Sequence, residues 1–467
     1  MKLPLLLALA MSAHGFHPPL APRGRRVAGA PRVGRLQGVT PAGDGELYAE
    51  KQPASSGGAT VGSSMINLVK AIVGSGVLSL PVGVAAFTSS RGAVPAAVAV
   101  MALITALSAY CFAMVARVCE ATRSQTWGEA WRRTVGESSA WVPSCFVSLL
   151  CFSASLQYTM VIGDSFSAIF TAAGLPRAIA SRRGAIGAVT MLGTLPLSLL
   201  PNLDMLKYTS FLGIGGLLYT AAFMIARVGS YVPGAALHAA AAIPPSFSAE
   251  PFKLSMMLQP KMFVLVSILA TAFCAHFIAP QFYNELADTK DGSSKMPAFN
   301  LLTAGGFVLS AALSAVFMGA GYMTFGGASN GYILNNYATT DRFAQAARLA
   351  IGGSIVTTYP LLHQGLRDTV VEVLGTSRVM TSIGCVGLIT LLGMKLTNLG
   401  TVAAVSGALV STSLVYVLPA IMFGQMLKQR IKSGMGSRRL RVELAGSRVV
   451  AVIGVFLVAI GMHAAFS

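Results

Sequence analysis

Long apolar runs alternate with short polar connections along most of the chain. A hydrocarbon layer about 30 Å thick takes roughly 20 residues of helix to cross, so an apolar run of that length predicts a transmembrane helix. Eleven such runs lie near residues 62–88, 93–116, 139–172, 184–201, 207–227, 261–283, 298–323, 342–363, 379–396, 399–426 and 448–466. Residues 228–249 are also uncharged, but three prolines and a run of alanines predict a loop there.

The composition supports a membrane protein. Charged residues make up 11% of the chain and hydrophobic residues 54%, with a mean hydropathy of +0.67. A soluble domain carries about 25% charged residues, so this chain lacks the polar surface that a globule needs in water. The net charge of +18 does not predict nucleic-acid binding, because the basic residues are scattered between apolar runs. The six cysteines form no metal-type cluster and predict helix packing.

The first 60 residues predict a targeting sequence rather than part of the fold. Residues 1–15 read as a signal peptide, with Lys2 ahead of a short apolar core. Residues 16–60 predict a disordered basic arm, because the stretch 16–43 holds five arginines, no acid and many Pro and Gly. Together the two segments resemble a bipartite plastid presequence. An ordinary signal peptide or a disordered cytosolic arm explains them as well. The membrane domain is then 61–467.

Lys and Arg in the connections predict the orientation. If the first run starts inside, the inner connections carry more Lys and Arg, including Arg132, Arg133 and the run 428–448. This favours an amino terminus inside and a carboxyl terminus outside. An odd number of spans suits two five-helix halves plus one extra helix. Many transporters consist of such inverted repeats, with broken helices at the substrate site.

The first apolar run has an interruption near its middle, at Gly74, Ser75 and Gly76. Each glycine weakens a helix by about 1 kcal/mol, and the peptide groups that it frees are tolerated only where they face a cavity. Freed amides suit a carboxylate and freed carbonyls suit an ammonium, so a zwitterionic amino acid fits both. Close packing of helices through small residues is the alternative.

The stretch NLVKAIVGSGVLSLP around this triplet resembles the first-span signature of the amino acid/auxin permease family, which includes sodium-coupled neutral and vacuolar amino acid transporters. Further stretches resemble the family in the same order: VIGDSF at 161–166, LPLSLLPNLDMLKYTS at 195–210, AHFIAPQFYNEL at 275–286, GYMTFGGASNGYILNNYATTD at 321–341 and YPLLHQGLRDTV at 359–370. The resemblance implies an all-α polytopic membrane protein with a five-plus-five inverted repeat, broken helices one and six, and one extra helix. This is the LeuT-like fold of the APC superfamily. It also implies secondary active transport of amino acids, coupled to H+ or Na+.

Carried onto this chain, the family's substrate contacts fall on six residues of the two broken spans. They are Gly74, Ser75, Gly76, Phe273, Cys274 and His276. The sixth run contains no Gly or Pro between Met262 and Ala279, so only the resemblance places its break. His276 is either a proton relay or a hydrogen-bonded packing residue.

The candidate ion-coupling residues are Asn67, Lys70, Asp164, Ser354, Thr357 and Thr358. Sodium-coupled members typically have Asn where this chain has Lys70, and an ammonium cannot ligate Na+. Lys70 therefore predicts a sodium-independent carrier, with the proton as the alternative coupling ion, unless Lys70 only snorkels to the interface. Asp164 is a proton site, an outer-gate residue or a helix cap at the interface. The eighth-span hydroxyls join a first-span cation site in the family, or bond their own helix.

The function predicted from these residues is transport of amino acids without a catalytic residue, metal or cofactor. Neutral substrates are favoured, because the small Gly/Ser site has no fixed charge. An intramembrane enzyme is not supported, since the sequence has no HExxH, no paired intramembrane carboxylates at helical spacing and no GxSxG on a predicted span. A transporter-like sensor and a Na+-coupled symporter are the alternatives. We expect a monomeric transport unit in the plastid envelope or in an endomembrane or vacuolar membrane, with the amino terminus on the cytosol-like side.

Overall fold

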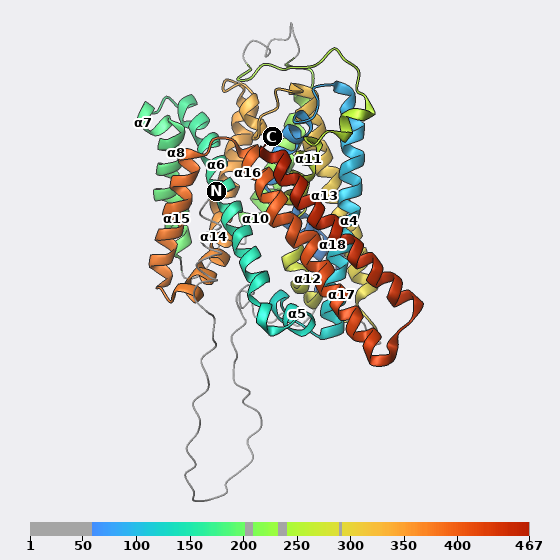
Figure 1. Ribbon diagram of the computed structural model, residues 1–467. Coiled ribbons are helices and arrows are strands. Elements are labelled where there is room, and N and C mark those ends of the chain that lie inside the picture. Colours follow the sequence, from blue (N-terminus) through green and yellow to red (C-terminus); the bar gives the residue numbers. More distant parts are fainter. Residues whose placement is uncertain (1–57, 201–208, 232–240, 289–291, 467) are drawn as a thin grey trace, which may run out of the picture. The chain divides into compact units, whose positions relative to one another are not determined.

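The computed structural model describes residues 58–200, 209–231, 241–288 and 292–466, and nearly all regular structure in these ranges is helical (Figure 1). The first half comprises α2 (Val61–Ile72), η1 (Ser75–Ser79), α3 (Leu80–Ala85), α4 (Val94–Thr122), α6 (Trp141–Ala172), α8 (Arg182–Val189), η4 (Thr190–Thr194), α9 (Leu195–Leu199) and α10 (Thr209–Arg227). The second half comprises α11 (Met262–Ala272), η7 (His276–Ile278), α12 (Ala279–Glu285), α13 (Met296–Phe325), α14 (Arg342–Leu374), α15 (Arg378–Lys395), α16 (Leu399–Ser406), η9 (Gly407–Ser411), η10 (Ser413–Val417), α17 (Leu418–Arg430) and α18 (Arg438–Phe466). Short helices in the connections are η2 (Arg91–Ala93), α5 (Trp127–Thr134), η3 (Glu137–Ser139), α7 (Arg177–Ala180), η6 (Leu254–Leu258), η8 (Ile333–Asn336) and η11 (Ile431–Met435).

Helices occupy each of the eleven predicted ranges, but they differ in length and apolarity. Within the described residues, seven helical segments are long and apolar enough to cross a membrane, and α2 with α3 makes an eighth across a bend of 48°. The other predicted ranges hold α8 to α9, α10 and α14. Helix α14 is long, but it carries several charged residues. The chain is a multi-pass membrane protein, and the number of eleven crossings stays a prediction.

Two predicted segments lie wholly or partly outside the described residues. The signal-like segment 1–15 and the basic arm up to residue 57 are outside them, and the membrane domain starts at α2 as expected. The predicted loop 228–249 is described only in part. Residues 241–249 form no helix, and Ser246 pairs with Gly326 in an isolated β-bridge.

Local sequence signals explain where α14 begins and ends. Asp341 caps its first turn, because the carboxylate accepts hydrogen bonds from the amides of Phe343 and Ala344. Gly375 ends the helix with a φ of 63°, a left-handed conformation that glycine adopts without strain. Pro360 lies inside the helix and removes one backbone donor near its middle.

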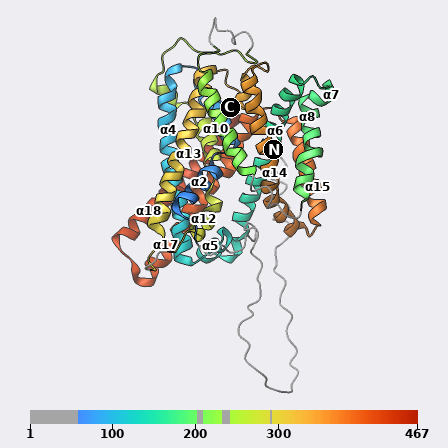
Figure 2. The same cartoon turned by 180° about the vertical axis from the view of Figure 1, so that it is seen from behind.

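Helices from distant parts of the sequence pack side by side. Helix α6 packs along α14 and also contacts α15, while α4 and α2 both pack against α13 (Figures 1 and 2). Small residues permit close approach at several of these contacts. A Cβ atom on Gly407 of η9 would lie 1.9 Å from the carbonyl oxygen of Ser267, so η9 and α11 meet almost backbone to backbone. In this packing, the two broken spans contact each other, α13 also contacts the first of them, and α16 contacts both.

Candidate functional site

The first span is broken where the sequence predicts it. Helix α2 ends at Ile72, and Gly74 is extended, with φ −109° and ψ −159°. The chain then continues as the 3₁₀ helix η1, which no side chain caps in the described region. Gly74 and Gly76 flank this start, while Ser75 belongs to η1 and its side chain lies outside what the structure describes. The glycines explain the break, because they lower the cost of leaving the helix.

The sixth span is interrupted at residues 273–275, where the family resemblance placed its break. Helix α11 ends at Ala272, Phe273 and Ala275 have non-helical backbone angles, and η7 begins at His276. The next helix, α12, carries Pro280 in its first turn, as α3 carries Pro81. Proline suits the first turn of a helix, since its missing N–H has no helical partner there. Pro280 is therefore the sequence signal that could have located this break.

The two breaks adjoin each other. Helix α11 packs against η1 and α3. A Cβ atom on Gly76 would lie 3.5 Å from the Cα atom of Ala272, the last residue of α11. The fold thus brings residues 74–76 and 273–276 together, although roughly 200 residues of chain separate them.

Tyr158 of α6 is a site residue that the sequence alone did not reveal. Its hydroxyl oxygen lies 3.9 Å from the position that a Cβ atom on Gly74 would take. The neighbouring Gln157 donates a hydrogen bond of 3.1 Å to the Ser406 hydroxyl and ties α6 to α16. Two adjacent polar side chains within the apolar third run are the signal that could have pointed to Tyr158. Its hydroxyl adds a hydrogen-bond donor and acceptor to the first-span break.

His276 is fully buried and anchors the sixth-span break to α4. Its Nε2 atom lies 2.8 Å from the carbonyl oxygen of Ser108, so the ring nitrogen donates to that carbonyl. The Ser108 hydroxyl in turn lies 3.0 Å from the hydroxyl of Tyr416. The imidazole packs edge-on against Phe112. These contacts correspond to the packing interpretation of His276.

The other two sixth-span candidates line the same break. Phe273 is fully buried and stacks on Phe307 with ring centroids 6.3 Å apart. Cys274 is partly buried and is a free thiol. Both side chains are uncharged, so this half of the candidate site is apolar.

The ion-coupling candidates do not gather at one point. Asn67 and Lys70 are exposed on α2, with Lys70 in the last turn before the break. Thr357 and Thr358 donate hydrogen bonds of 3.0 and 2.8 Å to the carbonyl oxygen of Ser354 in their own helix. The Ser354 hydroxyl faces Gly213 of α10. These contacts hold the three hydroxyls within α14 or against α10.

Asp164 forms part of a polar network between four elements. Its carboxylate accepts from Arg182 Nε of α8 at 2.5 Å and from Asn335 Nδ2 of η8 at 3.0 Å. Arg182 Nη1 also donates to the Gly393 carbonyl of α15 at 2.8 Å. The Asp164 side chain is only 8% exposed. It does not cap α6, which continues to Ala172, so the helix-cap alternative is wrong.

The connection between α13 and α14, residues 326–341, is bound to the first span and to α14. The Ser79 hydroxyl of η1 donates to the Gly331 carbonyl at 2.6 Å. Arg348 is buried and donates to the carbonyl oxygens of Leu334 and Tyr337 at 2.7 and 2.8 Å. At its end, Asp341 pairs with Arg227 at 2.9 Å. Burial opposes the charge of Asp341, but hydrogen bonds and the positive charge of Arg227 outweigh it and hold the pKa of Asp341 below its ordinary value.

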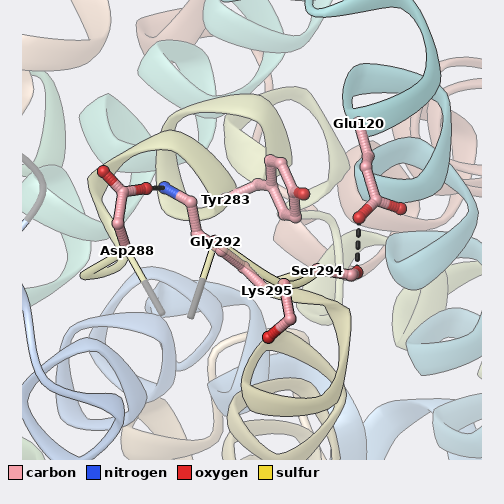
Figure 3. A pocket seen from close by; sticks show the side chains of 7 residues that line it. Glu120, Tyr283, Asp288, Gly292, Ser294 and Lys295 are labelled. Carbon is pink, nitrogen blue, oxygen red and sulfur yellow. Dashed lines mark hydrogen bonds and ion pairs between the residues drawn. The ribbon is translucent and has the colours of Figure 1, made fainter. Parts of the chain in front are cut away.

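A pocket of about 360 Å³ lies at the ends of α4, α12 and α13, apart from the two breaks (Figure 3). Its lining residues are Glu120, Tyr283, Asp288, Gly292, Ser293, Ser294 and Lys295. The polar groups of the pocket largely bond one another: Lys295 Nζ lies 2.8 Å from Asp288, and Ser294 donates to Glu120.

A backbone contact ties the start of the first span to the end of the sixth. The amide of Ala59, just before α2, donates to the carbonyl oxygen of Glu285, at the end of α12, at 3.2 Å.

No group of three or more His, Cys, Asp or Glu residues in the part of the chain that the structure describes could hold a metal ion. The six cysteines are free thiols in this region.

Two solved structures share the fold. The crystal structure of MhsT in complex with L-phenylalanine has a TM-score of 0.54 and 13% sequence identity, and covers 85% of this chain and 98% of that one. The inward-facing conformation of Mhp1 has a TM-score of 0.53 and 11% identity, and covers 88% of this chain and 90% of that one. The chain therefore has the predicted LeuT-like fold, with its first and sixth spans broken.

Sequence relatives agree with this fold. A protein of Danio rerio named "Putative sodium-coupled neutral amino acid transporter 11" is 24% identical over 429 residues, which are 89% of this chain and 88% of that protein. Vacuolar amino acid transporter 5 of Schizosaccharomyces pombe is 25% identical over 427 residues, 86% of this chain and 95% of that protein. The family of transmembrane amino acid transporter proteins matches residues 57–467. The chain therefore belongs to the transmembrane amino acid transporter protein family, whose members are transporters rather than enzymes.

Proposed function

We propose that this protein is a secondary active transporter of neutral amino acids that is driven by protons and does not need sodium. The observation that carries the proposal is the meeting of the two broken spans at Gly76 and Ala272. Broken helices that meet inside a bundle expose helix ends of both signs to one small volume. A zwitterion is the kind of solute that uses both.

The groups around the breaks suit the backbone of an amino acid. The amino end of η1 favours a carboxylate, and the Tyr158 hydroxyl beside Gly74 supplies one more donor. The carboxyl ends of α2 and α11 favour an ammonium. Phe273 supplies an apolar wall. None of these groups is ionised, so a substrate with a charged side chain would find no partner among them.

Lys70 supports independence from sodium. It lies four residues before Gly74, about one turn away along α2, at a position where sodium-coupled members of the family typically have Asn. An ammonium has three donors and no acceptor, so it cannot ligate a cation. A positive charge near a cation site also repels Na+.

The purified full-length protein in liposomes tests this proposal. Uptake of a panel of labelled neutral amino acids is measured at fixed pH in Na+ and in choline, and then with an imposed pH gradient. We expect equal uptake in Na+ and choline, and accumulation when the outside is more acidic. Loss of uptake in choline would contradict sodium independence.

A matched pair of variants sharpens the sodium test. Lys70→Asn restores the amide that sodium-coupled members carry, and we expect it to introduce a dependence on Na+. Lys253→Asn makes the same chemical change at a side chain that is 65% exposed outside the helices, and we expect it to behave as the unaltered protein. Equal behaviour of the two variants would remove Lys70 from the coupling site.

A sodium-coupled symporter is the second candidate. The name of the Danio rerio relative supports it, since that protein is named as sodium-coupled. The choline experiment separates the two functions.

We further propose that the protein resides in the plastid envelope or in an endomembrane or vacuolar membrane, with its amino terminus towards the cytosol. The arginine-rich, acid-poor stretch 16–43 supports the first location, and the vacuolar relative supports the second. Imaging of the full chain with a fluorescent protein at its carboxyl end distinguishes them.

A further inference from the structure

A buried histidine on α14 has no role in the site described above. His363 is 0% exposed, and neither of its ring nitrogens has a hydrogen-bond partner among the described residues. A neutral imidazole carries one N–H donor and one acceptor nitrogen, and a buried polar group normally finds a partner for each. The ring stacks on Tyr359, one turn earlier, with centroids 6.1 Å apart and planes 15° apart.

The register between α6 and α14 places a second unpaired group at the same level. The two helices are antiparallel, because Gly352 packs on Phe166 while Tyr359, further along α14, faces Thr159, further back along α6. Four more residues along α14 reach His363, and four more back along α6 reach Ser155. Ser155 is also 0% exposed, and its hydroxyl has no hydrogen-bond partner within the described chain.

This level of the α6–α14 interface lies close to the first-span break. Ser155 precedes Tyr158 by three residues on α6, which corresponds to a rise of about 4.5 Å. Tyr158 is the residue whose hydroxyl lies beside Gly74. By this register, His363 lies about one helical turn from Tyr158 along the α6–α14 interface.

The charged groups next to His363 on α14 are paired with each other, so a proton on the imidazole would add one positive charge to a locally neutral set. On α14, Arg367 is the next turn along, and its Nε atom is paired with Asp368 at 2.8 Å. Helix α6, which packs against α14, carries Cys145, Cys151, Tyr158 and Asp164, and Asp164 is paired with Arg182. Helix α15 carries Arg378, Cys385 and Lys395. Helix α10 carries Tyr219 and Arg227, and Arg227 is paired with Asp341 at the far end of α14. Segments η4 and α9, which also contact α14, contain no ionisable side chain.

We propose that His363 is the proton-binding site of the transport cycle, and that its protonated form takes the Ser155 hydroxyl as a hydrogen-bond partner. The inference rests on the proposed proton-driven transport and names the group that carries the proton. A proton from one side of the membrane forms an N–H bond with the lone pair of the neutral imidazole. After the substrate site has closed to that side and opened to the other, this N–H bond breaks and the proton is released there. The Ser155 hydroxyl accepts from the imidazolium, and the face of Tyr359 stabilises its positive charge.

The test uses the full-length protein in liposomes that contain a pH-sensitive dye. Two quantities are measured: acidification of the lumen when amino acid is added outside, and exchange of labelled for unlabelled amino acid at equal pH on both sides. We expect His363→Gln to lose substrate-dependent acidification and to retain exchange. In exchange, the carrier changes sides with amino acid bound in both directions, so no net movement of protons is needed. His463→Gln, at an exposed histidine near the end of α18, is the matched control and should retain both.

The outcomes separate this inference from the proposed function. If the unaltered protein transports amino acid without moving protons, proton coupling itself fails. If the unaltered protein moves protons and His363→Gln does so equally well, only the assignment of His363 is overturned. Should His363→Gln not fold, Ser155→Ala provides the second test. It keeps the histidine but removes its partner, so the pH of half-maximal uptake should shift, and an unchanged pH profile would overturn the proposal.

Discussion

At the scale of single residues, Asp164 and Arg182 form a largely buried ion pair outside the two breaks. Asp164 and Arg182 meet at 2.5 Å with side chains that are 8% and 21% exposed, and Asn335 completes the carboxylate's contacts. Such a pair costs desolvation when it forms, but breaking it leaves an uncompensated charge in a poorly solvated place. The pair therefore links α6 and α8 in one defined arrangement.

Replacing one partner of this pair should destabilise the protein more than replacing both. We expect Asp164→Asn and Arg182→Gln each to lower the free energy of unfolding by about 3 kcal/mol. The double variant should lose less than the two losses added together, because neither charge is then left alone. Denaturation of the purified protein in detergent measures this cycle.

The pair of Arg439 and Glu443 on α18 is the control for this cycle, because Arg439 is exposed and Glu443 keeps a second partner in Arg117. Its atoms lie 3.3 Å apart, but the Arg439 side chain is 87% exposed. Solvent screens such a pair, so Arg439→Gln should change stability by less than about 1 kcal/mol. Additive losses at Asp164 and Arg182 would show that their contact contributes nothing of its own.

Individual helices owe their limits to local sequence and their contacts to small residues. The eleven apolar runs lie within a few residues of helices in the structure, because length and apolarity are local properties. The first break was predictable from Gly74 and Gly76. The sixth was not predicted from composition, although Pro280 in the first turn of α12 marks it as Pro81 marks the first.

The close contact between η9 and α11 should make Gly407 intolerant of any side chain. A Cβ atom there would lie 1.9 Å from the Ser267 carbonyl oxygen, so the two backbones must move apart in Gly407→Ala. We expect a loss of about 1–3 kcal/mol, as for an overpacked core, together with a lower yield of folded protein.

Gly384 on α15 provides the matched glycine. A Cβ atom there meets nothing within 4 Å, so Gly384→Ala should be neutral or should stabilise the helix by up to about 1 kcal/mol. Thermal melting of both purified variants measures the difference. If Gly407→Ala melts at the temperature of Gly384→Ala, the two segments do not pack as described.

At the scale of the whole molecule, α18 should carry the chain across the membrane once after the basic turn that precedes it. The helix has 29 residues, which span about 43 Å, and 22% of its most apolar window is buried. The turn before it is rich in Lys and Arg, and such turns lie on the inner face.

Labelling of two introduced cysteines tests this topology. In a background without the six native cysteines, Ser433→Cys should be protected from a membrane-impermeant maleimide added outside, whereas His463→Cys should react. Reaction of both from the same side would contradict a membrane-crossing α18 and the predicted orientation.

Several features followed from the sequence by itself: a membrane protein, the ranges of its helices, the first break and, through six stretches in order, the family. These depend on apolarity, helix propensity and short motifs, which neighbouring residues determine. Only the tertiary structure decided which polar groups meet. It placed Tyr158 beside Gly74, paired Asp164 with Arg182, and buried His363 without a hydrogen-bond partner among the described residues. Such contacts depend on how each helix is rotated about its own axis and shifted along its neighbour. The partner helices lie far apart in the chain, so the local sequence of one helix does not determine either quantity.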